Sequence, residues 1–170
     1  MTTFYSLFPI PKFLDAPYAG LHISDDAVRV IQFGQGGRSL EIAKYGSRTL
    51  AQGIVEAGYI KDEKALSAVI KELVSKLGVT TVVASIPEEK MYLFKTDIVA
   101  NDDPQIRQGI EFKLEENVPL SPADAFFYYD IIPGEPAGKK SAVVSVAPRK
   151  VIDAYLAAIE GAGLKVLSFE

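Results

Sequence analysis

The stretch from residue 103 to residue 132 constrains the fold most, because it sets a helix, a proline turn and a strand in a fixed order. Asp103 can cap a helix, and Pro104 suits the first helical position because proline has no N–H to leave unpaired there. Apolar residues then recur at every fourth position: Ile106, Ile110 and Leu114. This spacing predicts a helix over 103–116 with one buried face.

The same stretch continues into a strand. Pro119 ends the helix, since the residue before a proline is pushed out of the helical region. Residues 125–132 are rich in aromatic and β-branched side chains, which favours a strand. Alternation along this strand places Phe126 and Tyr128 on one face and Phe127 and Tyr129 on the other. We expect one pair in the core, with the other pair facing solvent or a partner.

Composition excludes several function classes. Of the 170 residues, 48% are hydrophobic and 24% charged, which indicates a folded globular protein. The net charge of -4 gives no field that would attract nucleic acid. The chain has no cysteine, so disulfides and thiolate chemistry are excluded, and no apolar run approaches the roughly 20 residues of a membrane helix. We expect a cytoplasmic protein without a membrane span.

Residues 1–18 form an apolar N-terminal arm in which three prolines prevent one continuous helix. Two interpretations stay open. The arm packs on its own domain, or it docks on a partner or a membrane surface, since exposed apolar segments of this kind mark contacts.

Residues 19–87 predict a first unit of order β-β-β-α-β. Three short strands separated by turn residues indicate an antiparallel meander. Asp62 then caps a helix that ends before Gly78, and a near-continuous apolar run follows, which is typical of a strand in a parallel pairing after a crossover helix. The expected elements are strands 19–23, 27–33 and 39–45, helix 62–77 and strand 79–86. Residues 52–61 are expected to be a connecting stretch.

Residues 88–170 predict a second unit of order β-α-β-β-α-β. The expected elements are strand 91–99, helix 103–116, strands 125–132 and 141–147, a helix from Pro148 to about Gly161, and strand 164–169. This order is that of the ferredoxin-like fold, with two helices on one face of an antiparallel sheet.

Most familiar catalytic patterns are missing. The single histidine excludes a two-histidine metal site. Residues 34–39, GQGGRS, lack the spacing of a phosphate-binding loop and precede a strand, so a hairpin turn is favoured. Three neighbouring carboxylate pairs offer a general acid and base, but capping or solvated charge is favoured for each of them: Glu88-Glu89, Asp102-Asp103 and Glu115-Glu116.

Several short motifs, in this order and spacing, resemble one protein family. They are GLHIS at 20–24 with AVRV at 27–30, EAGYI at 56–60, ASIP at 84–87, EFKLEENVPL at 111–120 and AGLKV at 162–166. Together they resemble the N-terminal part of the type IV pilus assembly protein PilM family, which is related to FtsA in the actin-like ATPase superfamily. The resemblance implies an α/β (α+β) fold. Residues 19–87 would be a partial actin-like (ribonuclease H-like) subdomain 1A, and residues 88–170 an inserted subdomain 1C.

The resemblance also implies a nucleotide site, with ATP and magnesium as ligands of the full-length protein. The degenerate phosphate turn would consist of four residues: His22, Ser24, Asp25 and Asp26. His22 stands where the family has an acidic residue, and a neutral imidazole is a poor magnesium ligand. We expect this chain to be a piece of a longer protein that holds about half of the cleft, with no cofactor and no hydrolysis of its own.

The function implied by the resemblance is a bacterial cytoplasmic scaffold or adaptor of type IV pilus assembly, peripheral at the inner face of the cytoplasmic membrane. Its partner would be the cytoplasmic tail of an inner-membrane, PilN-like protein, docked along residues 86–97. Tyr92 and Phe94 share one face of that strand and are the predicted partner-binding residues; core packing is the alternative for both. A homo-oligomer is a further expectation. The alternative functions are an FtsA-like filament or cell-division protein, and an ATPase in the full-length form.

Overall fold

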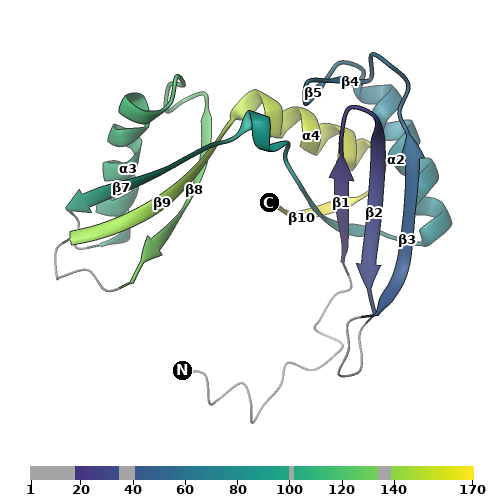
Figure 1. Ribbon diagram of the computed structural model, residues 1–170, viewed down its shortest axis with the longest axis horizontal. Helices are drawn as coiled ribbons and strands as arrows, with labels where there is room; N and C mark the ends of the chain where they lie inside the picture. The colour runs from purple at the N-terminus through teal and green to yellow at the C-terminus, as the bar shows by residue number, and fades with distance from the viewer. Residues whose placement is uncertain (1–17, 35–40, 100–101, 134–138) are drawn as a thin grey trace, which may run out of the picture.

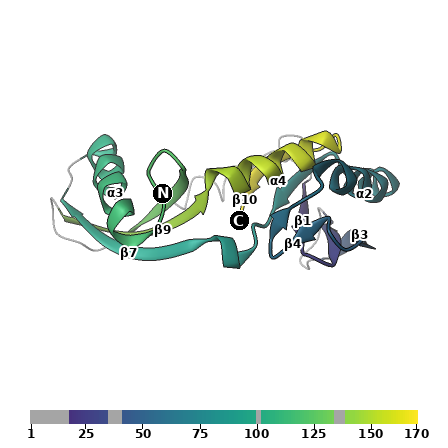
Figure 2. The same cartoon turned by 90° about the horizontal axis from the view of Figure 1, so that it is seen from above.

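The computed structural model describes residues 18–34, 41–99, 102–133 and 139–170. Within these ranges the chain forms two lobes, each built on its own β-sheet (Figure 1). The expected N-terminal arm and the predicted GQGGRS turn lie outside the described residues, apart from Tyr18 and Gly34. Seen from above, the helices lie along one side of both sheets (Figure 2).

The first lobe contains a five-stranded sheet in the order β10-β6-β1-β2-β3. Its strands are β1 (Ala19–Ile23), β2 (Ala27–Phe33), β3 (Ile42–Thr49), β6 (Thr81–Ala84) and β10 (Lys165–Phe169). β1, β2 and β3 form the predicted antiparallel meander. β6 pairs in parallel with both β1 and β10, so it is an inner strand of the sheet.

Two helices cover one face of this sheet, α2 (Glu63–Leu77) and α4 (Arg149–Gly161). α2 begins as predicted, because the Asp62 carboxylate accepts the N–H of Ala65, and it ends at Gly78 in the left-handed conformation that glycine adopts without strain. The apolar faces of both helices meet the sheet in one core, whose largest fully buried side chain is Tyr155. A small hairpin, β4 (Val55–Glu56) and β5 (Tyr59–Ile60), replaces the predicted connecting stretch.

The second lobe is a three-stranded antiparallel sheet in the order β7-β9-β8, covered on one face by α3 (Asp103–Asn117). Its strands are β7 (Tyr92–Val99), β8 (Ala125–Ile132) and β9 (Lys139–Pro148). α3 is capped by Asp102, which accepts the N–H of Gln105, and not by Asp103 as predicted. Phe127 and Tyr129 pack against the core of this lobe, while Phe126 and Tyr128 are exposed on the opposite face, so the alternation prediction is confirmed.

The predicted ferredoxin-like unit is wrong. α4 packs against α2 and the core of the first lobe, and β10 pairs with β6. The second lobe therefore has three strands and one helix instead of four strands and two helices. Because an amphipathic helix has the same sequence pattern over any apolar sheet, periodicity alone could not tell which sheet α4 covers. The division of the chain into domains at residues 18 and 87 stays a prediction.

Two connections join the lobes. One runs from β6 through the short helix η2 (Glu88–Lys90) into β7, and the other passes directly from β9 into α4. No helix in the described ranges is long and apolar enough to cross a membrane.

Candidate functional site

The predicted phosphate turn is the tight connection between β1 and β2, residues 24–26. Its backbone is closed by a hydrogen bond from the N–H of Ser24 to the carbonyl of Ala27, 2.9 Å. The Ser24 hydroxyl lies 2.5 Å from Asp26 Oδ1 and 3.1 Å from the carbonyl of Ala27, and it accepts from Arg29 at 3.1 Å. The polar groups of Ser24 are therefore used within the turn itself.

Asp25 binds the β4–β5 hairpin. Its carboxylate accepts the backbone N–H of Ala57 at 2.6 Å and that of Gly58 at 3.0 Å, one on each oxygen. Both of these residues have positive φ, 47° for Ala57 and 71° for Gly58, so their N–H groups belong to the tight turn of the hairpin. Asp25 thus links the β1–β2 turn to the turn of the β4–β5 hairpin, across 32 residues of sequence.

Asp26 and His22 have local partners as well. The hydrogen bond from Ser24 and, to a lesser extent, the charge of Arg29 lower the pKa of the exposed Asp26 carboxyl. His22 Nδ1 lies 2.8 Å from the hydroxyl of Ser85, at the end of β6. His22 therefore stands on the β1 strand as an exposed side chain that contacts the neighbouring strand.

Tyr155 on α4 contacts the same hairpin from the core. Its hydroxyl donates to the carbonyl of Gly58 at 3.1 Å, and the side chain is fully buried. Burial raises the pKa of this hydroxyl well above its ordinary value, and the negative charges of Asp25 and Glu89 raise it further. The sequence predicted the helix that carries Tyr155 but not this polar contact. No local signal indicated it, because the hairpin turns on Ala57-Gly58 and alanine is not among the residues typical of a two-residue turn.

As arranged, these residues do not fit a phosphate group or a magnesium ion. Both oxygens of Asp25 bind backbone N–H groups, Asp26 binds Ser24, and the turn contains no glycine that would let its backbone approach a phosphate. Two adjacent carboxylates also repel an anion at close range. Among the described residues, no group of three or more acidic or histidine side chains could hold a metal ion.

The predicted partner-binding residues lie where the first connection enters the second lobe. Tyr92 is the first residue of β7 and is 36% exposed, whereas Phe94 is half-buried and packs against the core below α3. The two share a face, because they stand opposite the buried residues Val146 and Val144 of β9. Tyr92 is therefore accessible, and Phe94 has mainly a packing role.

The connection through η2 packs against the β4–β5 hairpin. Lys90 Nζ lies 4.0 Å from the centre of the exposed Tyr59 ring. A Cβ added at Gly58 would lie 2.9 Å from Glu89 Oε1 and 3.2 Å from Pro87 Cβ, so η2 packs directly on the hairpin turn. A continuous set of contacts thus runs from Asp25 through the hairpin to the start of β7.

A comparison with protein families decides which family the chain belongs to. Residues 20–169 match the model of the type IV pilus assembly protein PilM family. The chain belongs to this family. No match is found among curated proteins.

Two solved structures share the fold. The chain superposes on a protein of the "PilM-PilN type IV pilus biogenesis complex" with a TM-score of 0.81 at 19% identity, over 91% of this chain and 47% of the other. It also resembles the cytoplasmic domain of EpsL, an inner-membrane component of the type II secretion system of Vibrio cholerae. That TM-score is 0.59 at 13% identity, over 91% of this chain and 57% of the other. The chain spans about half the length of these two proteins.

Proposed function

We propose that this PilM-family chain is part of a scaffold of type IV pilus assembly at the cytoplasmic face of the inner membrane. Its partner is the cytoplasmic tail of an inner-membrane pilus protein of the PilN kind. The match to the PilM family over residues 20–169 carries this proposal. It is supported by the likeness to a protein solved as part of a PilM–PilN complex.

The physical basis of the docking is an extended peptide bound where the two lobes meet. Such a peptide gains backbone hydrogen bonds from a sheet edge and fills pockets with alternate side chains. β7 is an outer strand of its sheet, and Tyr92 at its start presents an accessible aromatic ring. Large aromatic side chains contribute much of the binding energy in protein interfaces.

The test measures binding of synthetic peptides that correspond to the cytoplasmic tails of inner-membrane pilus proteins from the same source. We expect one tail to bind by calorimetry, and Tyr92→Ala to weaken it about tenfold. Tyr128→Ala is the matched control, because Tyr128 is also exposed on an outer strand of the same sheet but lies on β8. The proposal fails if no tail binds, or if both variants weaken binding equally.

We also propose that this chain does not hydrolyse ATP. The bonds of Asp25 and Asp26 within the protein support this, since both carboxylates of the turn already bind protein groups. Release of phosphate from magnesium–ATP above the buffer background, abolished by Asp25→Asn, would contradict it.

A further inference from the structure

Among the described residues β7 is an outer strand of its sheet, and its charge pattern is complementary to itself. On the face of the sheet that α3 leaves open, β7 presents Leu93, Lys95, Asp97 and Val99 in turn. The two apolar members are among the most exposed of the protein, Leu93 at 72% and Val99 at 83%. Ser141 on β9 donates to Asp97 Oδ1 at 2.6 Å, which orients the carboxylate on this face. An apolar residue thus flanks each end of a lysine–aspartate pair.

Two copies of β7 can pair edge to edge in an antiparallel manner about a two-fold axis through Thr96. This register places Lys95 of each copy opposite Asp97 of the other, and Leu93 opposite Val99. Opposite charges and apolar pairs at directly facing positions stabilise a sheet, whereas like charges there destabilise it. The neighbouring registers, centred on Lys95 or Asp97, set like charges against each other, so the charges select the register centred on Thr96.

We propose that β7 is a homodimer edge, at which two copies of this chain join their three-stranded sheets into one of six strands. Such an interface is isologous, because each patch meets its own copy. The inference rests on the charges of the Leu93–Val99 segment and not on Tyr92, and a peptide bound along the same outer edge of β7 would exclude the second copy.

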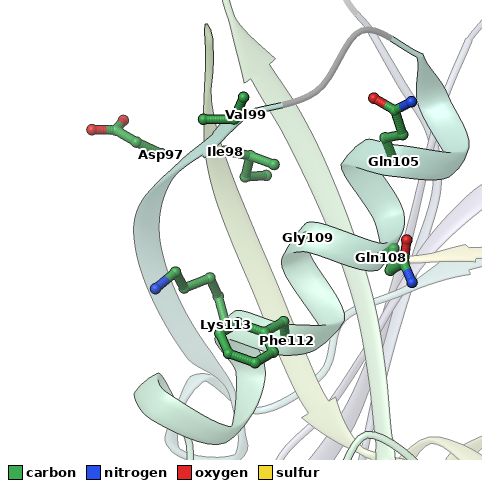
Figure 3. Close-up of a pocket in the computed structure, with 8 residues that line it drawn as sticks. All are labelled: Asp97, Ile98, Val99, Gln105, Gln108, Gly109, Phe112 and Lys113. Carbon is green, nitrogen blue, oxygen red and sulfur yellow. The ribbon is translucent and has the colours of Figure 1, made fainter. Parts of the chain in front are cut away.

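A groove beside β7 indicates that the second copy also makes contacts on the face of the sheet that carries α3. It has a volume of about 580 Å³ between β7 and α3 and is lined by Ile98, Gln108, Gly109 and Phe112, among others. Ile98 points toward α3 while Asp97 points away from it (Figure 3). The Phe112 ring at the groove is 71% exposed, and a second copy carries its own α3 to the same side of the joined sheet. The groove would then be closed from both sides.

A lysine in the middle of an outer strand often serves to prevent edge pairing. In β7 this protection is incomplete, because Asp97 follows Lys95 on the same face and neutralises it in the antiparallel register. The other outer strand of the sheet lacks this pattern: on the corresponding face β8 carries one charged residue, Asp130, between Tyr128 and Ile132. The pattern is therefore specific to β7.

The test exchanges the charges. Sedimentation of the wild-type chain between about 10 µM and 1 mM is expected to show a reversible dimer, since an interface made of one pair of strands is weak. Lys95→Asp places four acidic residues at the interface and Asp97→Lys four basic ones, so each variant alone should dimerise at least about tenfold more weakly. Both side chains are exposed, so circular dichroism should show unchanged folding.

An equimolar mixture of these two variants provides the decisive measurement. In its heterodimer, every facing pair at positions 95 and 97 joins an aspartate of one chain to a lysine of the other. The mixture should therefore associate about as strongly as the wild type. Lys71→Asp on α2 and Asp153→Lys on α4 change the same charges on exposed helix surfaces and should leave dimerisation unchanged. A wild-type chain that stays monomeric, or a mixture that associates no better than its components, overturns the proposal.

Discussion

Asp25 and Tyr155 bind the same two-residue turn from different elements. Asp25 accepts the N–H groups of Ala57 and Gly58, and Tyr155 donates to the carbonyl of Gly58. Tyr155 and Gly58 are buried, and a buried polar group without its partner costs more than the hydrogen bond itself contributes, so this contact holds the turn in one place. Of the four residues predicted to form a phosphate turn, Asp25 thus serves to fix a hairpin.

The Tyr155 hydroxyl predicts a dependence of stability on alkaline pH. Burial holds the pKa of the folded state above the ordinary value of 10, with Asp25 and Glu89 adding to the shift. Below pH 10 the hydroxyl is neutral in both the folded and the unfolded state, so its full contribution to the free energy of unfolding is present. Above pH 10 the unfolded state loses the proton first, and the free energy of unfolding falls by up to about 1.4 kcal/mol per pH unit.

Urea unfolding of the wild type and of Tyr155→Phe between neutral pH and about pH 11 checks this dependence. At neutral pH we expect the variant to be less stable by about 1 kcal/mol, because the Gly58 carbonyl loses its donor. The difference should shrink as the pH rises past 10, since phenylalanine has no proton to lose. A constant difference across this range would contradict the assignment.

At the scale of elements, sequence reasoning worked where local patterns decide the outcome. The spans Ala19–Ile23, Ala27–Phe33 and Ala125–Ile132 were predicted with the observed bounds, as was the cap of α2 at Asp62. Sequence reasoning failed where contacts between residues far apart in the sequence decide the outcome. The side-chain pattern of β10 does not specify β6 as its neighbour, and the turn residue Asp25 gives no local sign that its partners lie beyond residue 55.

The packing of α3 on β7 depends on Gly109. A Cβ at this position would lie 2.5 Å from Cγ2 of Ile98, a buried β-branched residue that cannot easily move aside. Overpacking of this kind costs about 1–3 kcal/mol, whereas replacing a helical glycine by alanine gains up to about 1 kcal/mol. We therefore expect Gly109→Ala to destabilise the protein by roughly 1 kcal/mol in urea unfolding. Gln108→Ala on the exposed side of α3 is the control, and a Gly109→Ala variant as stable as this control would refute the close contact.

At the scale of the whole molecule, the two lobes have separate cores. The core of the first lobe gathers side chains from β1, β2, β6, α2 and α4, while that of the second comes from α3 and the three-stranded sheet. The connections through η2 and from β9 into α4 join them covalently (Figure 1). Separate cores with few shared side chains favour opening of one lobe without the other.

Ile110→Ala tests this independence. Ile110 is fully buried between α3 and its sheet, so the truncation should cost about 2–5 kcal/mol. If the lobes open separately, hydrogen exchange should become faster in β7, α3 and β8 while amides in β1, β2 and α2 keep their protection. Ile70→Ala, an equally buried change in the first lobe, should give the reverse pattern. Equal acceleration in both lobes for either variant would mean that the chain unfolds as one cooperative unit, with the contacts from Asp25 to η2 strong enough to couple them.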